Sequence, residues 1–185
     1  MTSARLPRTV VPSRYEIRIE PDLAAATFVG QETIELTVRE PTAEIVLNAA
    51  DLGIRSAVFL NGAGRRAIAK VAVDVPAEQA LLRCAEPLDP GPWRLSLEFD
   101  GVLNDRLRGF YRSTFTRDDG TKAALAVTQF EATDARRAFP CWDEPAFKAV
   151  FQVTLVVDAG LAAISNTSPA SVRGVAASGK KAVTF

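Results

Sequence analysis

The chain has 185 residues, of which 48% are hydrophobic and 24% charged, and 22 basic residues balance 22 acidic ones. The hydrophobic content excludes a disordered tail, the zero net charge does not favour nucleic-acid binding, and no apolar run reaches the roughly 18–20 residues of a membrane-spanning helix. Because the chain contains no histidine, a Ser-His-Asp triad, a Cys-His dyad and an H-E-x-x-H zinc helix are all excluded within it.

Short segments that alternate apolar and polar residues run through the first half of the chain and predict half-buried β-strands. In chain order, strands are predicted at Tyr15–Glu20, Thr33–Arg39, Glu44–Asn48, Ile54–Leu60, Ala67–Val75 and Trp93–Phe99. Asn61-Gly62 and Asp119-Gly120 indicate hairpins, because glycine accepts the positive φ that such turns require. The proline-rich stretch Pro87–Pro92 predicts a rigid turn that no central strand crosses.

Three further strands are predicted in the second half, at Ala123–Glu131, Val150–Val157 and Lys181–Phe185. The apolar run Val150–Val157 predicts the most deeply buried strand of the chain. Lys181–Phe185 begins a strand and then stops, so we expect a domain cut from a longer protein, with an open edge that favours self-association. Many short strands with regular turn signals predict an all-β antiparallel sandwich or saddle with one short helix.

The strand Ala123–Glu131 changes character along its length. Side chains two apart share a face, which places Leu125, Val127, Gln129 and Glu131 on one side. That face is apolar at its start and polar at its end, as in a strand that leaves the core and enters a cleft. From the pattern alone, Gln129 and Glu131 are either the lining of such a cleft or the solvated tip of a strand.

The short helix is expected over Thr133–Ala138, with Thr133 as its N-cap and Asp134 in its first turn. Arg136 and Arg137 are expected to form ion pairs that shape the loop. The acids within reach in the sequence are Asp134, Asp143 and Glu144.

Large aromatic residues and two cysteines complete this region. Trp142 and Phe147 are expected to anchor the loop on the core. Cys141 has no histidine to activate it and is not expected to be a nucleophile. Cys84 and Cys141 are too few and too far apart for a disulfide framework, so we expect two reduced, buried thiols in a cytoplasmic protein.

The stretch TQFEATDARRAFPCWDEPAFKAVF, residues 128–151, resembles the signature of the N-terminal domain of zinc-dependent aminopeptidases of the aminopeptidase N family. Supporting matches are GFYRS at Gly109–Ser113, ISN at Ile164–Asn166 and the opening segment Leu6–Leu36. The resemblance covers nearly the whole chain. Trp142 is a departure, since relatives more often carry Phe there, and it should alter packing rather than chemistry.

The resemblance implies a β-saddle that packs on a thermolysin-like catalytic domain, which carries a G-x-M-E-N loop and the zinc ligands. It implies that Glu131 receives the free α-ammonium of a peptide substrate and that Gln129 lines the pocket for the first side chain. A fixed carboxylate binds a cationic amine more strongly than a neutral acceptor does. The Q-x-E spacing argues against the epoxide-hydrolysing branch of the family.

We therefore expect residues 1–185 to form a single N-terminal domain that ends before the catalytic domain of a zinc aminopeptidase. This chain is expected to hold no catalytic residue and no metal, to be inactive alone, and to bind neither nucleic acid nor membranes. The alternative is a non-catalytic β-sandwich that serves as an interaction scaffold. Glu131 discriminates between them, because a scaffold has no reason to keep an amine-binding acid beside Gln129.

Overall fold

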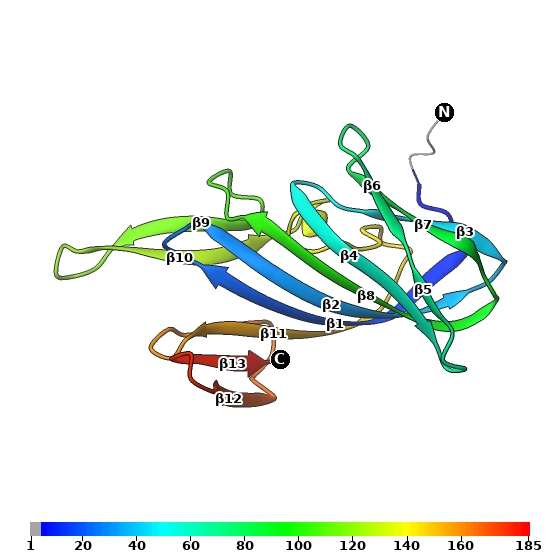
Figure 1. Ribbon diagram of the computed structural model, residues 1–185. Coiled ribbons are helices and arrows are strands. Elements are labelled where there is room, and N and C mark those ends of the chain that lie inside the picture. Colours follow the sequence, from blue (N-terminus) through cyan, green and yellow to red (C-terminus); the bar gives the residue numbers. More distant parts are fainter. Residues whose placement is uncertain (1–4) are drawn as a thin grey trace.

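The computed structural model describes residues 5–185 and is built almost entirely from β-strands (Figure 1). The strands of the first half are β1 (Val10–Asp22), β2 (Thr27–Val38), β3 (Thr42–Asn48), β4 (Leu52–Asn61), β5 (Arg66–Ile68), β6 (Lys70–Asp74) and β7 (Gln79–Leu88). Those of the second half are β8 (Gly91–Val102), β9 (Gly109–Thr116), β10 (Lys122–Gln129), β11 (Val150–Asp158), β12 (Ser171–Val175) and β13 (Lys180–Thr184). One 3-10 helix, η1, spans Ala135–Arg137. The all-β prediction with one short helix is confirmed.

The strands form one large sheet and two small ones. The large sheet has the order β12-β13-β11-β1-β2-β8-β4-β5, the second contains β3-β7-β6, and β9 and β10 form a two-stranded ribbon. Most pairs are antiparallel, but β1 and β11 run parallel, with Arg14 opposite Val150 and Ile19 opposite Leu155. A long connection precedes β11, and such a connection permits parallel pairing where a tight hairpin does not. The large sheet is therefore mixed.

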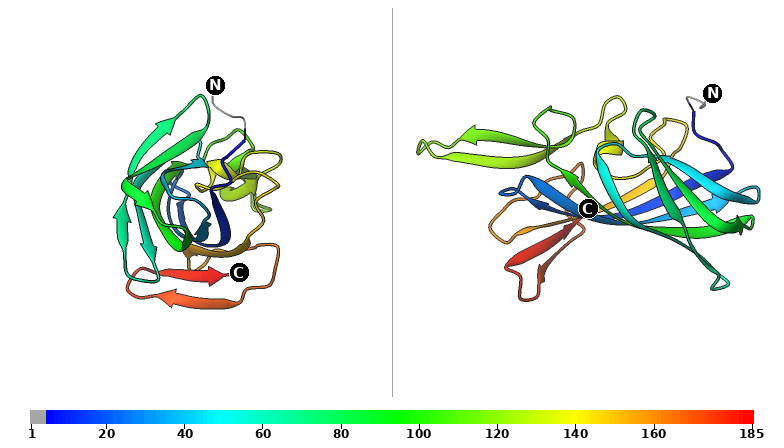
Figure 2. Two further views of the ribbon diagram at one scale, coloured as in Figure 1. Left: turned by 90° about the vertical axis from the view of Figure 1, so that its right-hand side faces the viewer. Right: turned by 45° about the horizontal axis from the view of Figure 1, so that its top comes forward.

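The hydrophobic core draws on both the large sheet and the three-stranded sheet, which lies to one side of it (Figure 2). Alternation along β2 and β8 buries every second side chain, as the period of a half-buried strand requires. The large sheet contributes Ile34, Leu36, Phe59, Leu95 and Leu97, and the small sheet contributes Ile45, Leu47, Ala80 and Leu82. Burial of this apolar surface is the main stabilising contribution to the fold.

Two sequence predictions are corrected in the first half of the chain. The turn at Pro87–Pro92 is shorter than expected, because Pro92 lies within β8, a central strand, opposite Thr37 of β2. β4 pairs with β8 only as far as Trp93, so at Pro92 the strand has one neighbour and the missing N–H is tolerated. The predicted strand Ala67–Val75 is divided between two sheets. Ala69 lies between β5 and β6, and its N–H donates to the carbonyl of Ala57 at 3.0 Å.

Two further corrections concern the last strands. β11 is not the most deeply buried strand, since Val150 is 58% and Phe151 51% exposed. An apolar run cannot distinguish one covered face from two. The Lys181–Phe185 segment is not an open edge either, because β13 lies between β11 and β12, and the edge strand is β12.

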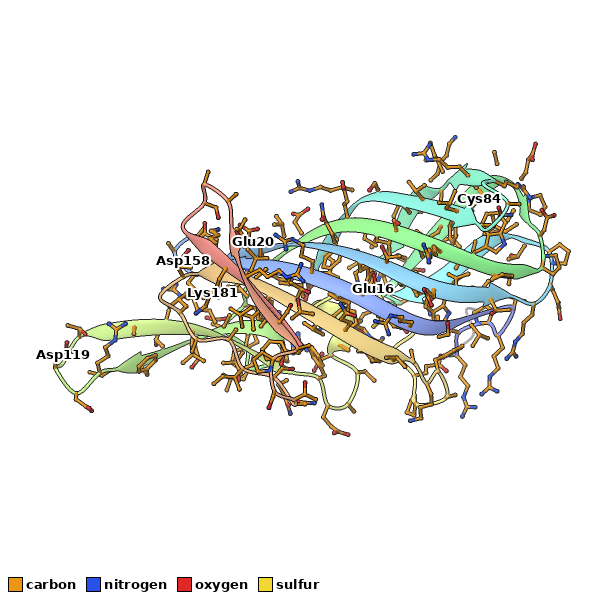
Figure 3. The ribbon with its side chains drawn as sticks, turned by 90° about the horizontal axis from the view of Figure 1, so that it is seen from below. Glu16, Glu20, Cys84, Asp119, Asp158 and Lys181 are labelled. Atoms are coloured by element: carbon orange, nitrogen blue, oxygen red, sulfur yellow. The ribbon has the colours of Figure 1, made fainter. Side chains whose placement is uncertain are left out.

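The β9–β10 ribbon extends away from the body of the domain, with Asp119 at its tip (Figure 3). Its far end is exposed, whereas Phe110 at its base is buried and contacts Phe28 with ring centroids 5.1 Å apart. The ribbon is thus anchored at the end that carries Gln129. Within residues 5–185, the structure contains no helix with the length and apolar character needed to cross a membrane.

Candidate functional site

Strand β10 ends at Gln129, and a tight turn follows it. The N–H of Asp134 donates to the carbonyl of Phe130 at 2.9 Å, which closes a turn around Glu131. The prediction of a strand through Glu131 is therefore wrong by two residues. Glu131 belongs to the turn, so its position depends on the segment that follows it as well as on β10.

Both predicted binding residues are accessible at this turn. Gln129 and Glu131 are exposed, and within residues 5–185 neither side chain has a hydrogen bond or an ion pair. Phe130 lies between them in the chain and packs edge-on against Phe139, with centroids 5.9 Å apart. The buried ring of Phe139 thus supports the turn while the two polar side chains stay available for a ligand.

The helix predicted at Thr133–Ala138 is present as the 3-10 helix η1, and it is shorter than predicted. Its N-cap is Asp134 rather than Thr133, and no side chain caps the first turn. The carboxylate of Asp134 instead accepts a hydrogen bond from Nε of Arg137 at 2.8 Å. The acid that could have capped the helix therefore pairs with its only buried arginine.

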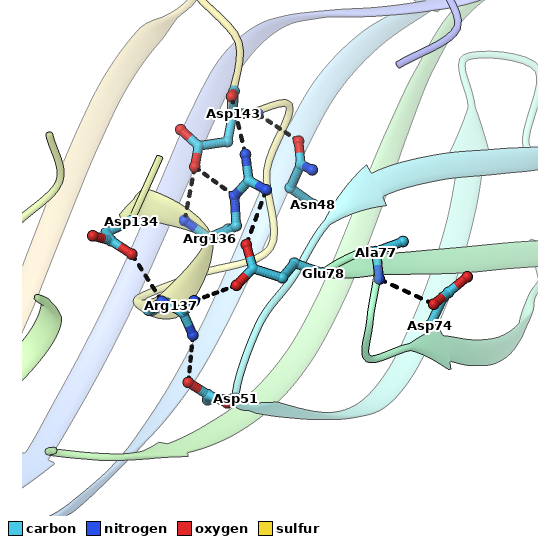
Figure 4. A network of polar contacts seen from close by, with 9 residues as sticks. All are labelled: Asn48, Asp51, Asp74, Ala77, Glu78, Asp134, Arg136, Arg137 and Asp143. Carbon is cyan, nitrogen blue, oxygen red and sulfur yellow. Dashed lines mark hydrogen bonds and ion pairs between the residues drawn. The ribbon is translucent and has the colours of Figure 1, made fainter. Parts of the chain in front are cut away.

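Arg136 and Arg137 form a network of ion pairs beneath the turn (Figure 4). Nε of Arg136 lies 2.9 Å from Oδ2 of Asp143, and its Nη1 lies 3.2 Å from Oε2 of Glu78. Arg137 pairs with Asp134, with Asp51 and with the second oxygen of Glu78. The predicted pairings with Asp134 and Asp143 are confirmed.

The sequence alone missed two members of this network and misplaced one. Asp51 and Glu78 lie far from the arginines in the chain, and no local pattern connects them. The predicted partner Glu144 does not join the network. Its carboxylate accepts a hydrogen bond from the backbone N–H of Leu6 at 2.5 Å.

The arginines are held as cations in a largely buried place. The side chain of Arg137 is 9% exposed, and that of Arg136 is 12% exposed. Burial lowers the pKa of Arg137, but the hydrogen bond with Asp134 and the charges of Glu78 and Asp51 outweigh it, so the net pKa is raised. Each buried charge thus has several partners, as buried charges require.

The loop after η1 is joined to the core by backbone bonds. Asn48 and Cys141 exchange two hydrogen bonds, of 2.7 and 3.0 Å, and the N–H of Trp142 donates to the hydroxyl of Tyr15 at 3.2 Å. Trp142 and Phe147 are buried, which confirms their predicted anchoring role. Burial raises the pKa of the Cys141 thiol well above its ordinary value, which disfavours the reactive thiolate form. Cys84 is also free and buried.

A buried acid that the sequence reading did not single out lies in the core near this loop. Glu32 of β2 is 3% exposed, and neither carboxylate oxygen has a hydrogen-bond partner within residues 5–185. Burial raises the pKa of Glu32 well above its ordinary value. The alternation of Ile34, Leu36 and Val38, extended back by two residues, places Glu32 on the inner face.

The side chains present do not fit a zinc ion. Structural and catalytic zinc sites use three or four ligands from His, Cys, Asp and Glu. Residues 5–185 contain no group of three such side chains placed to hold a metal. At the turn, the exposed carboxylate of Glu131 can bind a cationic group, and the exposed amide of Gln129 can bind a neutral one.

The fold is a β-rich domain, as the resemblance in the sequence implies, and it presents the Q-x-E segment at an exposed turn. Comparison with known families matches residues 11–185 to the peptidase M1 N-terminal domain. The chain belongs to this family.

Curated relatives agree with this assignment. The chain is 49% identical to Aminopeptidase M1-D of Oryza sativa subsp. japonica over 88% of its length, and 49% identical to Aminopeptidase M1 of Arabidopsis thaliana over 88%. It is 39% identical to Aminopeptidase N of Acetobacter pasteurianus over 89%. The chain spans 18% and 19% of the two plant proteins and 45% of the bacterial one.

Proposed function

We propose that this chain is the substrate-anchoring domain of a zinc aminopeptidase that removes N-terminal residues from peptides. In this proposal Glu131 receives the α-ammonium of the substrate, and Gln129 contacts the first side chain. The family assignment and the names of the relatives support it. Because the chain spans only part of those relatives, the activity belongs to a longer polypeptide.

One observation carries the proposal: within residues 5–185, Glu131 is an acid without a partner next to four acids that have one. Asp51, Glu78, Asp134 and Asp143 all pair with Arg136 or Arg137. Glu131 stays exposed on a turn that a hydrogen bond and the Phe130–Phe139 contact hold in place. A carboxylate held in this way is ready to pair with an external cation, and little ordering is needed when it does.

The zinc ion would be held by residues outside this chain, where it would activate water. The residues of this chain would bind and orient. A fixed acid at the amine measures the distance from the chain terminus to the bond that is cut, which an exopeptidase requires. An amide at Gln129 accepts varied first residues, because it presents a donor and an acceptor without a charge. Alone, the 185-residue chain is inactive in this proposal.

Two further properties belong to the proposal. We place the protein in the cytoplasm, which the two free, buried cysteines support because reducing compartments keep thiols unpaired. The chain alone is expected to self-associate through apolar surface that other domains cover in the longer protein. The exposed side chains of Val150 and Phe151 on β11 support this.

The test is kinetic and uses the full-length polypeptide. Loss of one partner of a desolvated charge pair costs about 2–5 kcal/mol, or about 30-fold to several thousand-fold. Glu131→Ala should therefore lower kcat/KM on dipeptides by that factor. Gln129→Ala removes an uncharged contact worth about 0.5–1.5 kcal/mol and should mainly change which first residue is preferred.

The matched control is Asp118→Asn, which removes an exposed acid in the turn between β9 and β10, at the far end of the same ribbon. It should leave kcat/KM unchanged, and zinc content should be equal in all variants. If Glu131→Ala retains the parent kcat/KM, the anchor role is wrong. If the full-length polypeptide has no peptidase activity at all, the scaffold alternative replaces the proposal.

A further inference from the structure

Glu78 is the acid that contacts both arginines of the network. Its Oε2 lies 3.2 Å from Nη1 of Arg136, and its Oε1 accepts from Nη2 of Arg137. Figure 4 shows its carboxylate between the two guanidinium groups. It comes from the turn between β6 and β7, and it lies 59 residues from Arg137 in the chain. It thereby joins the three-stranded sheet to the loop that carries the candidate site.

The backbone of Glu78 is fixed by its own turn. Its φ is +52°, a left-handed conformation that non-glycine residues seldom adopt. Its N–H donates to the carbonyl of Val75 at 3.1 Å, and its carbonyl accepts from Ala49 at 3.0 Å. In the same turn, the carboxylate of Asp74 accepts from the N–H of Ala77 at 3.1 Å. The Glu78 carboxylate therefore extends from a rigid base.

The position of Arg137 affects that of Gln129 through the glycine that pairs with Gln129. Gly109, the first residue of β9, lies directly opposite Gln129 in the ribbon. Gly109 has a φ of +67°, and a Cβ added there would lie 2.5 Å from Cβ of Arg137. The backbone beside Gln129 thus packs against the arginine with no space for a side chain.

Arg137 also transmits its position to Glu131. Its Nε donates to Oδ1 of Asp134, and the N–H of Asp134 closes the turn around Glu131 by its bond to Phe130. The aliphatic part of the Arg137 side chain therefore packs beside Gly109, and its guanidinium holds the side chain of Asp134, whose N–H closes the turn. Moving Arg137 would move both candidate binding residues.

We infer that Glu78 is a positioning residue. It sets the location of Gln129 and Glu131 by holding the guanidinium group of Arg137 in place. Its effect on catalysis rests on the proposed function, whereas its effect on the turn does not. Glu78→Gln keeps the shape of the side chain and removes its charge, so both buried guanidinium groups lose an anionic partner. Its carboxylate is about one-third exposed, so the loss should lie between that of an exposed and a buried pair.

The first experiment follows amide hydrogen exchange in the 185-residue chain. Glu78→Gln should speed the exchange of the Asp134 amide by about tenfold more than that of Leu97 in the core, where tenfold corresponds to 1.4 kcal/mol. The control is Glu44→Gln, which breaks the exposed pair with Arg83, at 3.3 Å, on the same small sheet. This control should leave the exchange rates of both amides, Asp134 and Leu97, unchanged. Equal acceleration at Asp134 and Leu97, or none at either, overturns the inference.

The second experiment measures kcat and KM of the full-length polypeptide. Glu78→Gln should raise KM for dipeptides by about tenfold with unchanged zinc content, since misplaced binding groups weaken binding first. A parent-like KM, in a protein where Glu131→Ala does lower kcat/KM, overturns the inference. If Glu131→Ala has no effect but the Asp134 amide still exchanges faster in Glu78→Gln, the proposed function fails and the positioning role stands.

Discussion

Glu32 should make the domain less stable as the pH rises. Its carboxyl is buried and has no hydrogen-bond partner among residues 5–185, so burial raises its pKa and favours the protonated form in the folded state. In the unfolded chain the pKa of glutamate is about 4.3. Between that pH and the raised folded pKa, the folded state binds one proton more than the unfolded state. The free energy of unfolding therefore falls by about 1.4 kcal/mol for each pH unit in this window.

Two substitutions separate ionisation from the burial of a polar group. Glu32→Gln removes the proton equilibrium but leaves an amide without partners, so the stability should lose this pH dependence. Glu32→Leu removes the polar group as well and should be more stable than Glu32→Gln by about 1–3 kcal/mol at every pH, the cost of an unsatisfied buried group. Both variants should be more stable than the parent at neutral pH, because the parent must pay to keep its proton there.

The assay is urea unfolding of the 185-residue chain from pH 5 to pH 8, followed by tryptophan fluorescence, since Trp93 and Trp142 are buried. The control is Glu98→Gln on the adjacent strand β8, where the acid is exposed. It should keep the slope of the parent. If Glu32→Gln also keeps that slope, Glu32 is ionised in the folded state and the reasoning is wrong.

Three other predictions concern the site and its surroundings. Gly109→Ala should cost about 2–5 kcal/mol in urea unfolding, because it adds left-handed strain to a clash with Arg137; Gly64→Ala, at a φ of +84° in open space, should cost only the strain. Cys84 and Cys141 should react with a thiol reagent only upon unfolding, since burial raises both pKa values, and fast labelling of the folded chain would refute this. The 185-residue chain should bind no stoichiometric zinc and cleave no aminoacyl reporter; zinc by elemental analysis with chelator-sensitive turnover would contradict it.

The sequence predicted the parts of the fold that depend on local pattern. The alternation of apolar and polar residues was sufficient to predict β1, β2, β4 and β8 as strands, because one face of each strand meets the core and the other does not. The burial of β11 was predicted wrongly, because a run of apolar residues does not reveal whether a second layer covers the strand. Its neighbour β13 was predicted to be an open edge, because its own residues do not show which strands pair with it, and its pairing with β11 and β12 is set by the tertiary fold.

In the candidate site, too, the sequence predicts the local features, and the tertiary fold decides the rest. Gln129 and Glu131 were chosen as candidates from a long motif, and Asp134 and Asp143 were predicted as partners of the arginines because they lie close to them in the chain. Asp51 and Glu78 could not be found in this way, because only the folding of the small sheet against the loop brings them to the arginines. Glu32 could have been found by extending the alternation of β2 by one step.

The most direct test of the account compares two ligands that differ only in the α-amine. Leucinamide carries the ammonium group, and isocaproamide is the same molecule without it. Inhibition constants against a reporter peptide should favour leucinamide by about 30-fold or more in the full-length polypeptide. In Glu131→Gln, which keeps the shape and loses the charge, the two constants should agree within about threefold. Discrimination that survives this substitution would contradict the assignment of Glu131 as the amine anchor.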